Sequence, residues 1–260
     1  MPGAADAGSA RGRSRLASRV LTRTKILGGA AAFAIAATTL GAGQPAMAAK
    51  QPVGCKAAPG KVLDNGSRSK KMVALTFDDG PSPYTARILK LLNGAGAKAT
   101  FFPVGQEIKG REKLLRAEFG AGMEIGNHTY THADLGNGGQ LATDEITKQT
   151  ATIRSVLGFT PCLFRPPFRS MGNDLVPRVK RLGMALVNGD VDPSDWETPG
   201  TEAIVQRVLD GARNGSIVIM HDGGGDRTQT VAALPTILKT LKARGYTLTT
   251  VSNLLGYKQV

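Results

Sequence analysis

Two of the three histidines in the chain, His128 and His132, are four residues apart. On one helical turn, imidazoles at this spacing face the same side and can bind a single metal ion. One carboxylate from elsewhere would complete three protein ligands and leave a fourth position for water. Surface helices also produce such a pair by chance, so the hypothesis of a metal site needs a neighbouring acid.

Two consecutive carboxylates, Asp78 and Asp79, follow an apolar run that reads as a strand. Like charges side by side raise one pKa, and a cation removes that conflict. Either aspartate could bind the metal while the other accepts a proton from the metal's water. The alternative is an ordinary Asp-Gly turn at the end of a strand.

Four further residues have chemistry that suits hydrolysis at a carbonyl. His221 ends an apolar run, and histidine can protonate an amine leaving group near neutral pH. Arg165 emerges from another apolar run and could hold a carboxylate ionised. Asp195 could orient His221, and the sole tryptophan, Trp196, could form a pocket wall for a sugar face. Core packing is the alternative for Trp196, and a structural role at a strand end is the alternative for His221.

The elements that position these residues alternate between short apolar strands and helices. We expect strands at 72–77, 99–104, 123–126, 163–165, 185–188, 217–220 and 247–251, and helices at 83–92, 107–119, 141–157, 175–181, 201–212 and 230–243. About seven βα repeats predict an α/β fold with a parallel sheet and outer helices. Because no strand precedes a Gly-rich dinucleotide fingerprint, a closed barrel is favoured, with the candidate residues on its C-terminal face.

Five segments, in order, resemble the motifs of the NodB-homology polysaccharide deacetylases. They are Thr76-Phe77-Asp78-Asp79-Gly80, His128-x3-His132, Arg165-Pro166-Pro167-Phe168, Asp192-x2-Asp195-Trp196 and Ile217-Val218-Ile219-Met220-His221-Asp222. The resemblance covers about residues 71–257 and implies a distorted (β/α)7 TIM-like barrel. It implies a metal-dependent hydrolase that removes N-acetyl groups from β-1,4-linked N-acetylglucosamine in peptidoglycan or a chitin-like glycan.

The resemblance also implies a metal set and a catalytic set. Asp79, His128 and His132 are expected to bind a divalent metal, usually Zn²⁺, with Co²⁺ or another divalent ion as the alternative. The catalytic set is Asp78 as general base, Arg165 steadying it, His221 as general acid and Asp195 supporting His221.

Substrate contacts are expected from Pro166, Pro167, Phe168 and Trp196, with the Phe168 backbone amide donating to the oxyanion. The family usually has Tyr-Gly where this chain has Phe168-Arg169. A backbone donor survives that change, whereas a tyrosine hydroxyl does not, and Arg169 adds charge to the cleft.

Three other functions fit parts of the same pattern. An esterase that removes O-acetyl groups from xylan would use the same site. A non-haem iron oxygenase also uses two histidines and one carboxylate, but it has no need of the general base and general acid. A non-catalytic glycan-binding module would not need every catalytic position to be filled.

The first 49 residues predict a secretory signal peptide. Six Arg and Lys residues precede an apolar, Ala-rich run from 26 to about 43, and Ala46-Met47-Ala48 supplies a small-residue cleavage site. A tether at 50–70 and the deacetylase domain at 71–257 follow. We therefore expect a protein that is secreted or associated with the cell wall and has no stable membrane span after cleavage; a retained membrane anchor is the alternative.

Without this segment the chain keeps 27 basic and 19 acidic residues, a net charge of +8. Such a surface is attracted to anionic wall polymers or lipid headgroups. Export, an aromatic content of 5% and the lack of long basic runs argue against nucleic acid, so the expected partner is the polysaccharide, bound by a monomer. A disulfide between Cys55 and Cys162 would join the exported N-terminal segment to the domain; two free thiols are the alternative.

Overall fold

The structure, a computed structural model, describes residues 61–257. The predicted signal peptide, most of the predicted tether and Cys55 lie outside the described residues. Cys162 is buried and is not a free thiol, but its bond to Cys55 remains a prediction.

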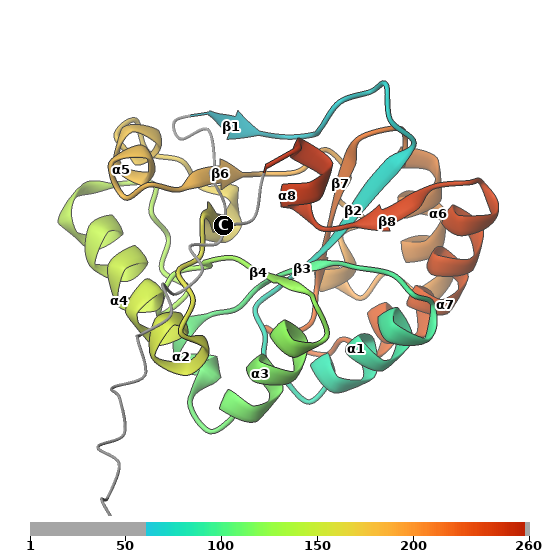
Figure 1. Cartoon of the computed structure of the whole chain (residues 1–260), viewed down its shortest axis with the longest axis horizontal. Coiled ribbons are helices and arrows are strands. Elements are labelled where there is room, and N and C mark those ends of the chain that lie inside the picture. Colours follow the sequence, from blue (N-terminus) through green and yellow to red (C-terminus); the bar gives the residue numbers. More distant parts are fainter. Residues whose placement is uncertain (1–60, 258–260) are drawn as a thin grey trace, which may run out of the picture. The chain divides into compact units, whose positions relative to one another are not determined.

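Within residues 61–257, seven parallel strands form the wall of a barrel (Figure 1). They are β2 (Met72–Asp78), β3 (Thr100–Phe102), β4 (Glu124–Ile125), β5 (Leu163–Phe164), β6 (Ala185–Val187), β7 (Ser216–His221) and β8 (Thr247–Thr249). One sheet has the order β4-β3-β2-β7, with β8 also paired to β2. A second sheet has the order β1-β6-β5, where β1 is Val62–Leu63.

Single parallel bridges join the two sheets at both edges, from Asn127 to Phe164 and from Val191 to Val218. We call these two junctions the seams. They close the sheets into a ring, and the predicted distorted (β/α)7 barrel is confirmed.

Helices surround the strands (Figure 1). They are α1 (Thr85–Gly94), α2 (Gly105–Ile108), α3 (Glu112–Gly120), α4 (Gly139–Leu157), α5 (Leu175–Arg181), α6 (Thr201–Gly211) and α7 (Thr228–Ala243), with α8 (Val251–Leu255) after the last strand. Two 3₁₀ turns, η1 (Pro167–Arg169) and η2 (Asp195–Glu197), follow β5 and β6. Of the helices in the described part of the chain, none combines the length and the apolar character that crossing a bilayer requires.

The two faces of strand β2 have different roles: one packs against the helices and the other points into the barrel toward the site. Its side chains alternate, because successive residues of a strand point to opposite faces. Val73, Leu75 and Phe77 pack among the outer helices, and burial of such a side chain contributes roughly 2 kcal/mol. Ala74 instead packs inside the barrel with Val251 of α8, and the same inward row continues to Asp78 at the C-terminal end.

Two sequence expectations need correction. The helix expected at 107–119 is split into α2 and α3, because Gly110 between them has a φ of 79°, which a helix cannot contain. The expected tether includes β1, which pairs with β6 through Val62–Leu186 and Leu63–Val187. A two-residue strand is too short to give a periodic signal, so the sequence did not predict it.

Candidate metal centre and catalytic cleft

Asp79, His128 and His132 come together at the C-terminal end of the barrel. The Asp79 Oδ1 lies 3.3 Å from Nε2 of His128 and 3.1 Å from Nε2 of His132. One ligand atom from each of the three residues lies within 4.8 Å of the others. Among the described residues, this is the only group of three or more His, Cys, Asp or Glu side chains that could hold a metal ion.

The donor set fits a divalent cation. His128 Nδ1 lies 2.7 Å from the Arg165 carbonyl oxygen, which only an N–H can satisfy, so a neutral ring presents the Nε2 lone pair to Asp79. The buried Asp79 Oδ1 accepts no hydrogen bond. A cation between these atoms would satisfy all three, and the Arg165 carbonyl would fix the His128 tautomer.

The two histidines lie on a loop, so the expectation of one helical turn is wrong. Thr129 and His132 have φ values of 67° and 62°, in the left-handed region. This loop, which we call the histidine loop (residues 128–132), is hydrogen-bonded to α4. The Glu145 Oε2 accepts from the amides of Tyr130 (2.8 Å) and Thr131 (2.7 Å). These anchors, and not helical periodicity, bring the imidazoles to one side.

Asp78 is buried at the end of the inward row of β2, beside the metal set. Its Oδ1 accepts from Arg165 Nη1 at 2.7 Å, and the same nitrogen donates to the Thr76 hydroxyl at 2.6 Å. Arg165 is 1% exposed and lies over the Phe102 ring, 4.3 Å from its centroid. A buried carboxylate that is bonded to a buried guanidinium is held in one orientation.

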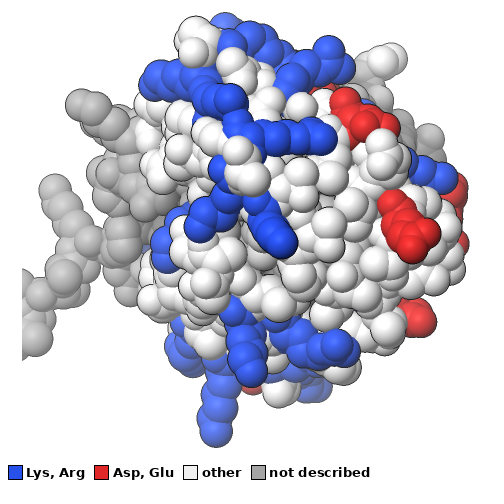
Figure 2. All heavy atoms as spheres, turned by 90° about the vertical axis from the view of Figure 1, so that its right-hand side faces the viewer, with Lys and Arg blue, Asp and Glu red and all other residues white. Residues whose placement is uncertain are grey.

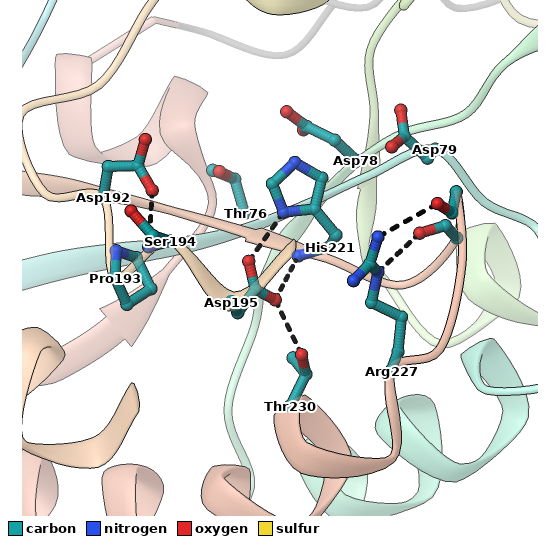
Figure 3. Close-up of polar contacts among 12 residues, drawn as sticks. Thr76, Asp78, Asp79, Asp192, Pro193, Ser194, Asp195, His221, Arg227 and Thr230 are labelled. Carbon is teal, nitrogen blue, oxygen red and sulfur yellow. Dashed lines mark hydrogen bonds and ion pairs between the residues drawn. The ribbon is translucent and has the colours of Figure 1, made fainter. Parts of the chain in front are cut away.

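His221 ends β7 beside Asp78 of β2, and it is held by Asp195 (Figure 3). Its Nδ1 lies 2.7 Å from Asp195 Oδ1, and its backbone N–H donates to Oδ2 at 2.9 Å. The Thr230 hydroxyl also donates to Oδ2, at 2.7 Å. Burial lowers the pKa of His221, but the hydrogen bond and charge of Asp195, with the charges of Asp78 and Asp79, raise it to about 9. With Nδ1 engaged, Nε2 is the atom available to a substrate.

These groups line a cleft of about 700 Å³. Phe168 and Trp196 are 69% and 53% exposed on its walls, and Phe168 meets the His132 ring edge-on with centroids 4.7 Å apart. Pro166 lines the cleft, whereas Pro167 is buried and does not, since it begins the 3₁₀ turn beneath it. Trp196 is therefore not a core residue.

The unusual pair Phe168-Arg169 forms a turn in which both residues have a φ of 56°. Nε of Arg169 donates to Asn188 Oδ1 at 2.8 Å, and its Nη1 lies 3.9 Å from Asp192 Oδ2, so Arg169 contributes a cation to the cleft wall. The Phe168 amide is in the first turn of η1, where a helix provides no acceptor, and it can donate to a ligand.

Sequence reasoning missed three supporting residues: Thr76 beneath Arg165, Thr230 beneath Asp195, and Glu145 beneath the histidine loop. Only Thr76 carried a usable signal, because a polar residue in the inward phase of a buried strand needs a partner inside the barrel.

Comparison with known proteins gives a consistent result. Residues 65–187 match the family model described as polysaccharide deacetylase. A peptidoglycan-N-acetylglucosamine deacetylase of Bacillus cereus is 42% identical over 195 residues, which cover 73% of this chain and 91% of the relative.

Two further proteins are similar. A bifunctional xylanase/deacetylase of Pseudobutyrivibrio xylanivorans is 33% identical over 80% of this chain, but the match covers only 36% of that longer protein. Among solved structures, a peptidoglycan N-acetylglucosamine deacetylase bound to an N-hydroxybenzamide derivative aligns with a TM-score of 0.74 at 28% identity, covering 76% of this chain and 94% of that one.

Proposed function

Because the chain belongs to the polysaccharide deacetylase family, we propose that it hydrolyses the N-acetyl groups of β-1,4-linked N-acetylglucosamine polymers, with peptidoglycan ahead of chitin-like glycans. The observation that carries this proposal is the geometry of the cleft, which is lined by a carboxylate next to the metal set and by a histidine that an aspartate holds. This arrangement suits addition of water to an amide and protonation of an amine. The oxygenase and the non-catalytic module, considered from sequence, are set aside because the chain is a hydrolase of this family.

The metal set, Asp79, His128 and His132, is proposed to hold Zn²⁺, which two imidazoles and one carboxylate suit. When bound there, the ion would lower the pKa of water toward about 7 and polarise the acetamide carbonyl. The metal-binding oxygen of Asp79 faces the histidines, so the role of base falls to its neighbour Asp78.

Asp78 is proposed to accept the proton of the attacking water. The Arg165 bond at 2.7 Å orients that carboxylate before it acts. His221 then donates the proton on Nε2 to the departing glucosamine nitrogen, so that acetate leaves as the C–N bond breaks. The Phe168 amide is proposed to donate to the oxyanion.

The exposed rings of Phe168 and Trp196 are proposed to contact the sugar faces. Aromatic surfaces of this kind bind the apolar faces of sugars and leave the hydroxyl groups in water. The predicted signal peptide supports export, which would bring the protein to the cell wall, where its substrate lies.

The test is release of acetate by the purified mature protein from N-acetylglucosamine oligomers and from peptidoglycan. The protein is first treated with a chelator and then restored with single metals. We expect no release after chelation and the greatest recovery with Zn²⁺ or Co²⁺. Full release from the chelated protein, or none from any N-acetylated glycan, would contradict the proposal.

A second candidate is O-deacetylation of xylan, which the likeness to the xylanase/deacetylase favours. The same cleft would attack an ester, and an ester needs less help at its leaving group because an alcohol departs more readily than an amine. Replacement of His221 by Ala should therefore cost more on the amide than on the ester. The two functions separate by the ratio of acetate released from acetylated xylan and from N-acetylglucosamine oligomers.

A further inference from the structure

The backbone of Asp79 lies in a conformation that its neighbours must hold. Its φ is 73°, in the left-handed region, which residues with a side chain seldom adopt. Its Oδ1 faces His128 and His132 and accepts no hydrogen bond that could fix its direction. The other side of this carboxylate is packed against backbone, which restricts its orientation further.

Gly223 and Gly224, which we call the glycine pair, provide that packing. A Cβ on Gly223 would overlap the backbone carbonyl of Asp79, and a Cβ on Gly224 would overlap Asp79 Oδ2. The Gly223 amide also donates to the Asp78 carbonyl at 3.2 Å. Only glycine permits this close approach, and the bare backbone of the pair forms a wall behind the carboxylate.

Arg227 holds the glycine pair in place (Figure 3). Its Nε donates to the Gly223 carbonyl at 2.7 Å, its Nη2 to the Gly224 carbonyl at 3.1 Å and its Nη1 to the Asp226 carbonyl at 3.1 Å. The side chain is buried on the cleft wall, and in residues 61–257 no carboxylate lies within ion-pair distance of it. Burial of a cation that is bonded only to carbonyls costs free energy. This cost indicates that the position of the guanidinium serves a purpose other than stability.

We propose that Arg227 is a positioning residue for the metal centre: its guanidinium fixes the two carbonyls of the glycine pair, and the pair fixes the Asp79 carboxylate toward the two histidines. This inference rests on the proposed function. Lysine would keep the charge but lacks the planar fork that reaches two successive carbonyls. The requirement is therefore for the fork as well as for the charge.

The test compares the wild-type protein with Arg227→Lys and Arg227→Met. The matched control is Arg116→Met, because Arg116 also donates to a carbonyl, that of Val156, away from the cleft. Zinc affinity is measured by competition with a chromophoric chelator, and ligand geometry by the visible spectrum of the Co²⁺-substituted protein. We expect both Arg227 variants to bind zinc about 10- to 100-fold more weakly and to change the Co²⁺ spectrum, as loss of a partner behind a ligand does, while the control matches the wild type.

A purely structural Arg227 would lower thermal stability but leave zinc affinity and the Co²⁺ spectrum unchanged, and that result would overturn the inference. If Arg227→Met does not fold, Arg227→Lys and Gly224→Ala decide the question by the same two measurements, because the alanine methyl presses on Asp79 Oδ2. A wild-type protein that binds neither metal contradicts the proposed function itself. Wild-type binding with unchanged variants contradicts only the role of Arg227.

Discussion

At the scale of single residues, the adjacent acids Asp78 and Asp79 differ in their partners. Asp79 faces two imidazoles, and Asp78 bonds to a guanidinium. We expect Asp78→Asn to lower kcat/KM about 10²- to 10⁴-fold, because it removes the proposed general base, and to leave zinc content unchanged. Acetate release and metal analysis of the same preparation check this. Asp210→Asn, an exposed acid on α6, should match the wild type, and an active Asp78→Asn would count against the assignment.

The pKa of His221, raised to about 9, sets a second expectation. A general acid must carry its proton, so kcat/KM should fall as pH rises through the pKa of His221. A bound divalent ion moves that limb to lower pH, since its charge opposes that of Asp79. Asp195→Asn should move the limb lower still, because it removes the main influence that raises this pKa.

The pH profiles of kcat/KM for the wild type and Asp195→Asn check this expectation. Asp192→Asn, in the same loop but not bonded to His221, is the control and should keep the wild-type limb. The same protonation stabilises the fold. The pKa of His221 in the folded protein lies above its ordinary value of 6.5, so the stabilisation is complete below about pH 6.5 and is lost as pH rises through about 9. If kcat/KM of Asp195→Asn falls at the same alkaline pH as that of the wild type, His221 is not the general acid.

The candidate site residues could be predicted from the sequence because each is a charged or ionisable residue next to an apolar strand. Paired acids, a His-x3-His pair and an arginine that ends an apolar strand are conspicuous at strand ends, and the barrel brings such ends together. The residues that support them do not stand out. Thr230 and Glu145 are ordinary polar residues of helices, and only the folded contacts reveal that they hold Asp195 and the histidine loop.

At the scale of elements, helix α4 positions the metal ligands without contacting a metal. Its Glu145 accepts three hydrogen bonds from the histidine loop, two from backbone amides and one from the Thr131 hydroxyl. We expect Glu145→Ala to destabilise the protein by about 1–3 kcal/mol and to weaken zinc binding about 10-fold. Denaturant unfolding and metal competition measure the two effects. Asp144→Ala, on the exposed side of α4, is the control, and equal zinc affinity in both variants would contradict the role of α4.

Element types were more predictable than the loops between them. The predicted and observed bounds of α5 coincide at Leu175–Arg181, because apolar periodicity and the following Gly183 define that helix well. The histidine loop could not be predicted, since a spacing of four residues suits a helical turn as well as a loop. The loop is fixed by Glu145 and by Asn127, whose Oδ1 accepts from the Thr129 amide. Those anchors are distant in sequence or carry no local pattern.

At the scale of the whole molecule, metal binding should couple to stability. A ligand that binds only the folded state stabilises it by about 4 kcal/mol at a concentration 1,000-fold above Kd. For a domain of this size each kcal/mol shifts Tm by about 2–4 °C, so chelation should lower Tm by about 8–16 °C. Calorimetry with and without zinc measures this. His132→Ala should show a much smaller zinc-dependent shift in Tm. A wild-type Tm that is the same with and without zinc would contradict a bound ion at this site.

The surface charge gives another expectation at this scale. Lys and Arg side chains gather on the face shown in Figure 2, and the groove between α1 and α7 is lined by Arg87, Lys90, Lys239 and Lys242 without an acid. Because salt screens such charges over a Debye length of about 10 Å at 0.1 M, retention on anionic wall polymers should fall between about 0.05 M and about 0.5 M NaCl. Cosedimentation with walls before and after removal of those polymers measures it, and retention that ignores salt would contradict it.

The residues of the cleft come from both sheets, on either side of the seams. Asp78, the metal set and His221 come from the sheet that contains β2, whereas Phe168, Arg169, Asp192 and Trp196 follow β5 and β6 of the other sheet. Arg165 and Asp195 reach across to Asp78 and His221, and the Phe168 ring meets His132. Substitution of the exposed side chains that follow β5 and β6 can therefore change the cleft wall without replacing Asp78, the metal set or His221, as long as Arg165, Asp195 and the Phe168 backbone stay in place.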